Sequence, residues 1–336
     1  MENAHLPSVF LERLRAVIPV QDRGPVLESF AFKRDISVRV NTLKVKIQDA
    51  AAQLLDKGIK ALPVPWCAEA FVLSEVEARA ISDDPLVREG KIYIQSLSSM
   101  LPAVILDPRP GENVLDLCAA PGSKTSQMAA MMKNEGWITA VEVVKERMYK
   151  LKNVLSLLGV RNVSIKLMDG RRFRQQGELF DKILVDAPCS SEGRFKTSDK
   201  KSFQYWSLRK IKEMVQKQRG LVLSAGRLLK PGGVLVYSTC TFAPEENEGV
   251  IDWLLRKSKE RLEVLPVDVP GVQSYPAVQE WQGKTFSKEV QNCFKVLPNP
   301  TMEGFFVAKL IKVKRSNGQN AKSFTNTFDF LTFLTF

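Results

Sequence analysis

The chain has 336 residues, 44% of them apolar and 26% charged, which is typical of a globular protein of about two domains. It contains no run of about 18 uncharged apolar residues, and residues 1–5 lack the basic and apolar stretches of a secretory signal. We therefore expect a cytoplasmic protein without a membrane span. The net charge of +12, from 49 Lys and Arg against 37 Asp and Glu, fits a polyanionic partner such as nucleic acid, and it fits simple solubility equally well.

Residues 1–100 predict a separate small α/β module. Helical spacing of apolar residues distinguishes its helices from strands, in which apolar and polar residues alternate. The expected elements are a helix over 9–17, a strand over 36–40, a helix over 48–57 that stops at Gly58, and short strands over 62–64 and 71–73.

Residues 101–312 predict a second unit, in which strands and helices alternate. The expected strands cover 113–118, 137–143, 163–168, 181–186, 232–238 and 304–310, and the expected helices cover 124–132, 145–158, 208–228 and 245–257. This alternation calls for a parallel sheet with helices on both faces. Pro231–Gly233 predicts a sharp turn from helix into strand. Residues 313–336, basic and then rich in Phe, are expected to form a tail, either flexible or docked on the body.

Five cysteines lie far apart, at positions 67, 118, 189, 240 and 293. An odd number without a Cys-x-x-Cys pair indicates reduced thiols in a cytosolic protein. The single histidine is His5, near the amino terminus. We therefore expect neither a metal site, which needs clustered ligands, nor a Cys–His protease, in which an imidazole activates the thiol.

Two of these cysteines directly follow apolar, strand-like runs. Cys189 lies in Asp-Ala-Pro-Cys-Ser after the run 182–185, and Cys240 lies in Ser-Thr-Cys-Thr after the run 234–237. The carboxyl ends of strands in an open parallel sheet are where ligands bind, so both thiols are expected in one cleft. The alternative interpretation is that each is a small buried apolar residue, the usual role of a free cysteine.

A third segment, Asp116–Thr125, joins an expected strand to an expected helix and reads Asp-Leu-Cys-Ala-Ala-Pro-Gly-Ser-Lys-Thr. Its small residues let a ligand approach the backbone closely. Neither the three spaced glycines of a dinucleotide loop nor the Gly-Lys-Ser/Thr of a P-loop is present. Glu142 and Asp169 end the next two strands. Alone, each fits a helix cap or turn, but their order after successive strands favours a cofactor site.

Together the three segments resemble the Nop/Sun (RsmB/Nop-type) family of S-adenosylmethionine-dependent RNA cytosine-C5 methyltransferases. The similarity covers roughly residues 30–312, since Arg39–Lys44, Lys91–Gln95, Thr241–Glu248 and Glu303–Ala308 also match segments of the family. It implies an α/β class I methyltransferase (Rossmann-like) fold with a mostly parallel seven-stranded sheet. It also implies that the amino-terminal module is RRM-like and binds RNA.

The resemblance implies an S-adenosylmethionine site built from this loop and the following strand ends. Glu142 would bind the ribose hydroxyls, Asp169 and Gly170 would lie near the adenine, and Asp186 would contact the target base or the cofactor amino group. The expected cofactor residues are Cys118, Ala119, Ala120, Pro121, Gly122, Ser123, Lys124, Glu142, Arg147, Asp169, Gly170 and Asp186.

The resemblance also gives the two thiols different roles. Cys240, in the Thr-Cys motif, would add to C6 of cytosine, which makes C5 nucleophilic enough to accept a methyl group. Cys189, in the Pro-Cys motif, would help to release the product. DNA cytosine methyltransferases use the Pro-Cys cysteine as the nucleophile, so a second cysteine favours RNA. Lys124 and Arg194 are candidates for lowering a thiol pKa.

We expect a monomer that acts on ribosomal or transfer RNA, with no metal and no membrane partner. The amino-terminal module and the basic Arg194–Lys201 segment are the expected RNA contacts. The main alternative is a catalytically silent RNA-binding or ribosome-assembly factor of the same fold. A methyltransferase for proteins or small molecules is a third possibility, which the paired thiols disfavour.

Overall fold

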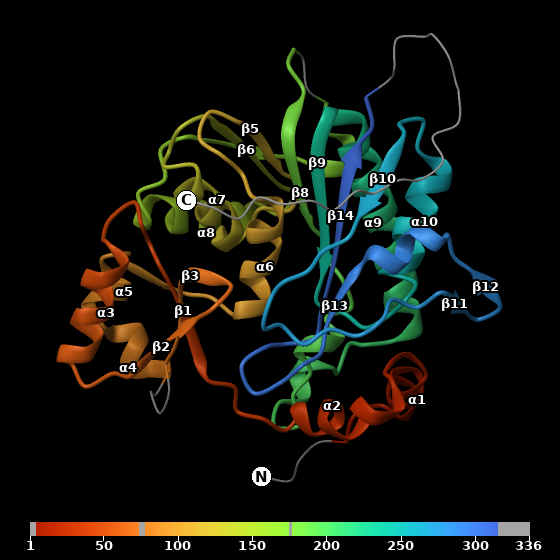
Figure 1. The fold of residues 1–336 in the computed structure, drawn as a ribbon, viewed down its shortest axis with the longest axis horizontal. Coiled ribbons are helices and arrows are strands. Elements are labelled where there is room, and N and C mark those ends of the chain that lie inside the picture. The colour runs from red at the N-terminus through yellow and green to blue at the C-terminus, as the bar shows by residue number, and fades with distance from the viewer. Residues whose placement is uncertain (1–4, 74–77, 175–176, 315–336) are drawn as a thin grey trace, which may run out of the picture.

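The computed structural model describes residues 5–73, 78–174 and 177–314 (Figure 1). The expected tail lies outside the described residues from position 315 onward. The amino-terminal elements are α1 (Ser8–Val17), α2 (Arg23–Ser29), β1 (Ile36–Val40), α3 (Ile47–Asp56), β2 (Ala61–Val64), β3 (Cys67–Leu73), α4 (Ala78–Asp83), α5 (Pro85–Arg88) and β4 (Ile92–Ile94). They are followed by α6 (Leu97–Leu106), β5 (Asn113–Asp116), α7 (Ser123–Met131), β6 (Trp137–Glu142), α8 (Lys145–Leu157), β7 (Val163–Leu167), β8 (Phe180–Asp186), α9 (Leu208–Leu228), β9 (Leu229–Thr239), α10 (Glu248–Lys257), β10 (Leu262–Leu265), β11 (Glu280–Trp281), β12 (Lys284–Thr285), β13 (Phe294–Val296) and β14 (Phe305–Lys312).

The amino-terminal module contains an antiparallel sheet in the order β2-β3-β1-β4. The alternation along β1 sends Val38 and Val40 into the module's own core with Leu54 of α3. Arg39, on the opposite face, is also buried and donates a hydrogen bond from Nη2 to Ser126 Oγ on α7 at 2.9 Å. Both faces of this small sheet are therefore covered, one by its own helices and one by the second unit.

The larger sheet has the strand order β10-β14-β9-β8-β5-β6-β7, and β13 pairs with β14 beside this path. Strands β5 to β9 are parallel to one another, while β14 is antiparallel to both β9 and β10. The order reverses between β5 and β8, and such a switch point opens a crevice at the carboxyl ends of the strands. The expected mostly parallel, Rossmann-like sheet is confirmed.

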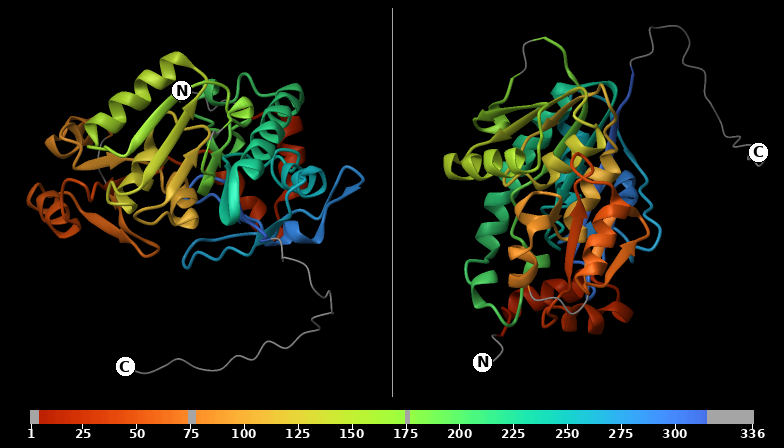
Figure 2. Two further views of the ribbon diagram at one scale, coloured as in Figure 1. Left: turned by 90° about the horizontal axis from the view of Figure 1, so that it is seen from above. Right: turned by 90° about the vertical axis from the view of Figure 1, so that its left-hand side faces the viewer.

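Helices cover both faces of the larger sheet, as the two views in Figure 2 show. Residues that alternate along the buried strands separate the two layers. Leu184 and Val236 pack into the cluster that contains residues of α6 and α7, whereas Ile183 and Leu235 pack against α9 and α10. α6 thus packs on the large sheet although it spans the expected boundary near residue 100. Among the described residues, no helix is both long and apolar enough to cross a membrane.

α1 and α2 pack beneath the larger sheet, at the carboxyl ends of β8 and β9 (Figure 1). Phe10 of α1 is 1% exposed and lies in ring contact with Phe30, Phe195 and Trp206. Arg13 of α1 also pairs with Glu245 at 2.7 Å, in the segment that follows Cys240. These helices therefore support the loops after β8 and β9.

The strand β9 differs from its expectation at its amino-terminal end. It begins at Leu229, directly after α9, and includes Pro231–Gly233, which were expected to form a separate turn. The bend is absorbed within the strand by a register shift against β8 and by Gly232, whose φ of +84° is in the left-handed region that favours glycine.

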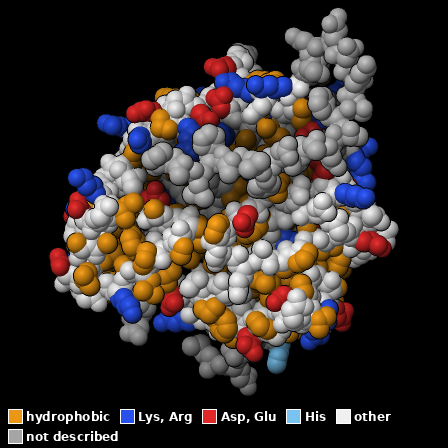
Figure 3. Space-filling view, in the orientation of Figure 1, with side chains coloured by type: hydrophobic (Ala, Val, Ile, Leu, Met, Phe, Trp, Pro, Cys, Tyr) orange, Lys and Arg blue, Asp and Glu red, His pale blue; other side chains and the backbone are white. Residues whose placement is uncertain are grey.

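On the face shown in Figure 3, Lys and Arg side chains are spread among Asp and Glu side chains around the outline, not gathered in one patch.

Candidate active site

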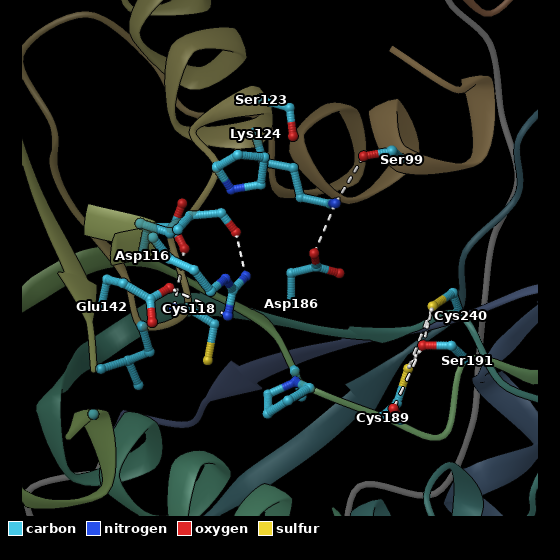
Figure 4. A pocket seen from close by; sticks show the side chains of 18 of the residues that line it. Ser99, Asp116, Cys118, Ser123, Lys124, Glu142, Asp186, Cys189, Ser191 and Cys240 are labelled. Carbon is cyan, nitrogen blue, oxygen red and sulfur yellow. Dashed lines mark hydrogen bonds and ion pairs between the residues drawn. The ribbon is translucent and has the colours of Figure 1, made fainter. Parts of the chain in front are cut away.

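A cavity of about 800 Å³ opens at the carboxyl ends of β5, β6, β8 and β9. Every expected site residue except Gly122 lines it, and the amino-terminal module contributes residues Tyr93–Gln95 to the same wall. Figure 4 shows the cofactor loop and Glu142 on one side and the two thiols on the other, with Asp186 between them. One continuous space therefore joins the expected cofactor and base sites.

The loop from β5 to α7 is held by Asp116, which is 1% exposed. Its carboxylate accepts hydrogen bonds from Thr125 Oγ1 at 2.8 Å and from Cys118 N at 3.3 Å. Burial raises the pKa of Asp116 to about 6. Gly122 caps α7 with a φ of +111°, and a Cβ there would lie 3.0 Å from Leu151 Cδ1. Gly122 thus lets the loop turn close to α8 but does not line the cavity.

Glu142, at the end of β6, has one carboxylate oxygen that the protein does not satisfy. Oε1 accepts from Val143 N at 2.8 Å and Val144 N at 2.9 Å. Oε2 is buried and accepts no hydrogen bond, and it lies 3.4 Å from Arg147 Nη1. Arg147 donates in turn to Ala120 O in the loop at 2.7 Å. A buried acceptor without a donor calls for a ligand hydroxyl, which is what a ribose would supply.

Asp169 follows β7 and caps the short 3-10 helix Gly170–Arg172. Its Oδ1 accepts from Arg171 N at 2.9 Å, and the Arg171 guanidinium pairs with the carboxylate. These hydrogen bonds lower the pKa of Asp169. The capping role considered from the sequence is therefore present, and Asp169 also lines the cavity.

The two thiols lie side by side, with 3.4 Å between Cys189 Sγ and Cys240 Sγ. Each is half-buried, and Ser191 Oγ lies 3.6 Å from Cys240 Sγ and 3.9 Å from Cys189 Sγ. Both cysteines line the open cavity, so they are not the small core residues of the alternative interpretation. Cys67 and Cys293, by contrast, are buried outside it.

The surroundings shift the pKa values of the two thiols in opposite directions. A hydrogen bond from Cys189 lowers the pKa of the Cys240 thiol against the opposing effect of burial, and the positive charge of Arg194 lowers it further. The same hydrogen bond raises the pKa of Cys189, and burial adds to that effect. Cys240 is therefore the thiol that ionises more readily, and Cys189 remains the donor. The thiolate is the nucleophilic form of cysteine.

Lys124 reaches the centre of the cavity from α7 but not the thiols. Its Nζ pairs with Asp186 Oδ2 at 2.7 Å and donates to Ser99 Oγ at 2.8 Å. Asp186 Oδ1 also accepts from Ser238 Oγ at 2.8 Å. Of the two basic residues considered for thiol activation, Arg194 acts on Cys240 and Lys124 orients Asp186.

Sequence reasoning missed several residues that contact the expected ones. Ser99 and Ser191 were not singled out, and neither were Glu192 and Glu246, which lie buried behind the thiols. Ser191 could have been found from its place beside Cys189. Ser99 comes from α6 and carries no local signal of its contact with Lys124.

Comparison with known proteins gives the family and the fold of the chain. The family model for 16S rRNA methyltransferase RsmB/F matches residues 103–311, and the model for the N-terminal domain of 16S rRNA methyltransferase RsmF matches residues 6–97. The tRNA (cytosine(49)-C(5))-methyltransferase of Pyrococcus abyssi is 40% identical over 283 residues, covering 82% of this chain and 88% of that enzyme.

Two further relatives extend the match along the chain. Ribosomal RNA small subunit methyltransferase F of Cronobacter sakazakii is 38% identical over 91% of this chain, which spans 63% of that enzyme's length. The crystal structure of a methyltransferase homolog protein from Pyrococcus horikoshii is 36% identical, with a TM-score of 0.75, and the match covers 92% of this chain and 100% of that one. The resemblance seen in the sequence is thereby confirmed: the chain belongs to the RsmB/F (Nop/Sun) family of S-adenosylmethionine-dependent RNA cytosine-C5 methyltransferases.

Proposed function

We propose that this protein methylates C5 of a cytosine in RNA, with Cys240 as the nucleophile and Cys189 as the group that assists release. The observation that carries the proposal is the 3.4 Å contact between two half-buried sulfur atoms in the cavity that also contains the cofactor loop. A single thiol would suffice for attack. A second thiol in contact with it supplies a proton donor and acceptor at the same point.

The residues around the cofactor loop fit S-adenosylmethionine. Glu142 Oε2, which is buried and accepts no hydrogen bond from the protein, would accept one from a ribose hydroxyl, and Asp169 and Gly170 line the cavity farther along the sheet edge. The loop residues Cys118–Pro121, with Ser123 and Lys124, would hold the remainder. Bound there, the cofactor supplies an activated methyl group on a sulfonium.

The thiols prepare the base for that methyl group. The Cys240 thiolate adds to C6, so the C5–C6 double bond opens and its electrons make C5 nucleophilic. After C5 has taken the methyl group, a base removes the C5 proton, the double bond re-forms, and the bond from Cys240 to C6 breaks. Cys189, which hydrogen-bonds to Cys240, protonates the departing sulfur. Asp186, held by Lys124 and Ser238, would contact the target base or the cofactor amino group.

Ribosomal and transfer RNA are both compatible substrates, since the relatives named above include enzymes for each. We infer that residues up to about 100 form the RNA-binding module and residues 101–312 the methyltransferase unit. Tyr93 and Gln95 of the module line the catalytic cavity, so RNA bound on the module would lead directly to the thiols. We also infer a monomeric enzyme, because the whole cavity is lined by residues of one chain.

The two roles can be tested by removing each thiol in the full chain. Cys240→Ala is expected to abolish methylation of an unmodified RNA transcript and to form no covalent adduct. Cys189→Ala is expected to attack and methylate but to release slowly, because the departing sulfur lacks its proton donor. It should accumulate a protein–RNA adduct that survives denaturing electrophoresis and is absent from the double variant. The transcripts to try are 16S ribosomal RNA and transfer RNA.

Cys293→Ala is the matched control, because that thiol is buried outside the cavity. It should methylate RNA and form no stable adduct. Adducts trapped by Cys240→Ala would reverse the assignment of the two cysteines. Full activity in both single variants would rule out the covalent mechanism.

A further inference from the structure

Two buried glutamates lie behind the thiols, and each joins the loop of one cysteine to the loop of the other. Glu192 follows Cys189 on the loop after β8 and is 2% exposed. Its Oε2 accepts hydrogen bonds from Thr241 Oγ1 at 2.9 Å and from Phe242 N at 3.0 Å, both on the loop after β9. Its Oε1 accepts from Trp206 Nε1 at 2.8 Å. Glu192 therefore fixes the segment that follows Cys240.

Glu246 makes the reverse connection. It lies on the loop of Cys240 and is fully buried. Its Oε2 accepts from Ser190 N at 3.0 Å, directly after Cys189, and from Gln218 Nε2 of α9 at 2.7 Å. Gln218 Nε2 also donates to Pro188 O, directly before Cys189, at 2.9 Å. Glu246 and Gln218 thus hold the backbone on both sides of Cys189.

A pair of hydroxyls closes the connection between the glutamates. Ser190 Oγ and Thr241 Oγ1 lie 2.7 Å apart, and each belongs to the residue that follows a cysteine. The Thr241 hydroxyl donates its hydrogen bond to Glu192, so Ser190 is the donor within the pair of hydroxyls. The backbone N–H of Gly193 also donates to Cys240 O at 2.9 Å. Every one of these contacts crosses between the two cysteine loops.

Burying two carboxyl groups costs folding free energy, so their presence here calls for a functional reason. Neither Glu192 nor Glu246 forms an ion pair with Lys or Arg among the described residues, so their burial is compensated mainly by the hydrogen bonds between the loops. Burial raises the pKa of both, and that of Glu246 to about 8. Apolar side chains could join the loops at lower cost, but they would not fix the backbone direction as hydrogen bonds do.

We infer that Glu192 and Glu246 are positioning residues that fix the two sulfur atoms relative to each other, and that the contact of Glu246 with Ser190 places Cys189 for release of the RNA. The inference rests on the function proposed above. It predicts that loss of Glu246 leaves attack by Cys240 intact while release becomes slow. The variant should therefore resemble Cys189→Ala.

The test uses the full chain, S-adenosylmethionine and the transcript that the wild-type chain methylates. Two quantities are measured: adduct that survives denaturing electrophoresis, and 5-methylcytosine in the same RNA. Glu246→Ala is expected to raise the ratio of adduct to methylated cytosine about tenfold, the effect of one lost hydrogen bond to a buried group. Glu246→Gln keeps an oxygen that accepts from Ser190 N and should restore a ratio near that of the wild type.

Glu248→Gln is the matched control. Glu248 is equally buried on the same segment, but it contacts Lys295 Nζ at 2.8 Å and Val278 N at 2.9 Å and neither cysteine loop. It should keep the wild-type ratio. The same rise in Glu248→Gln would mean general loosening and would overturn the inference. A wild-type ratio in a folded Glu246→Ala variant would also overturn it.

If Glu246→Ala does not fold, Thr241→Val provides a second test, because it removes the hydroxyl between Ser190 and Glu192 while it keeps the side-chain shape. We expect its adduct ratio to rise, and an unchanged ratio contradicts the inference. Cys189→Ala on the same transcript separates the two ideas. If Cys189→Ala forms an adduct but Glu246→Ala and Thr241→Val do not, only the positioning role of the glutamates is contradicted. No adduct in Cys189→Ala removes the proposed mechanism itself.

Discussion

At the scale of single residues, Glu142 offers the sharpest test of the cofactor site. Its Oε2 is buried and accepts no hydrogen bond, although Arg147 Nη1 lies 3.4 Å away, so a bound ribose would supply the missing hydrogen bonds. Removing a charged hydrogen-bond acceptor lowers the binding free energy of its ligand by about 1.5–3 kcal/mol, or roughly tenfold to a hundredfold in affinity. Glu142→Ala should therefore weaken S-adenosylmethionine binding by that factor in calorimetry.

Glu146→Ala is the control for this measurement, because Glu146 is exposed in the first turn of α8 and does not line the cavity. Its affinity should equal that of the wild-type protein. Unchanged binding in Glu142→Ala would remove Glu142 from the cofactor site.

Residues at strand ends were predictable from the sequence, and their partners were not. Cys189, Cys240 and Glu142 follow apolar runs, and the topology of a parallel sheet brings such positions to one edge. The contact between Lys124 and Ser99 depends on how α6 packs against α7, which no local pattern encodes. The reciprocal contacts of the buried glutamates likewise join two loops that are distant in the sequence.

At the scale of elements, α1 is tied to the catalytic loops and not only to its own module. Phe10 is 1% exposed and packs on Phe195, which directly follows Arg194. Replacing a buried Phe by Ala typically costs about 3–5 kcal/mol. Phe10→Ala should lower the midpoint of chemical unfolding and reduce methylation, because the loop that carries Arg194 loses its support.

Val9→Ala serves as the comparison for Phe10→Ala. Val9 is the neighbouring residue on α1 but is 42% exposed, so its truncation should change the midpoint little. If Phe10→Ala matched Val9→Ala in both stability and activity, α1 would not support the catalytic loops.

Regular elements were largely predictable, and short irregular ones were not. The alternating strand β1 and the long helix α9 match their expected ranges, because the periodic spacing of their apolar residues is visible in the sequence. The strands β10 to β13 were not expected. Each has at most four residues, which is too short to show a clear period in the sequence, and each depends on pairing with another strand, as β10 pairs with β14.

At the scale of the whole molecule, the site depends on both units at once. The topology places the cofactor loop and the thiols at one edge of the large sheet, and the small module supplies Tyr93 and Gln95 to the same cavity. Buried Arg39 joins the module to α7, the helix that follows the cofactor loop. The relative placement of two units depends on such long-range contacts. The two units were therefore predictable from the sequence, but the cavity that both of them line was not.

The net charge of +12 makes a prediction about the whole molecule, namely that RNA affinity falls steeply with salt. Each phosphate neutralised on single-stranded RNA contributes a slope of about −0.7 in log affinity against log salt. Lys200 and Lys201 are exposed on the segment after Arg194, so Lys200→Ala with Lys201→Ala should make the slope shallower by about 1.4.

The matched control is Lys257→Ala with Lys259→Ala, at the end of α10 and outside the cavity. Fluorescence anisotropy at several salt concentrations measures both slopes. A wild-type slope near zero would contradict electrostatic RNA binding, and equal slopes in the two double variants would place the RNA path away from Lys200 and Lys201.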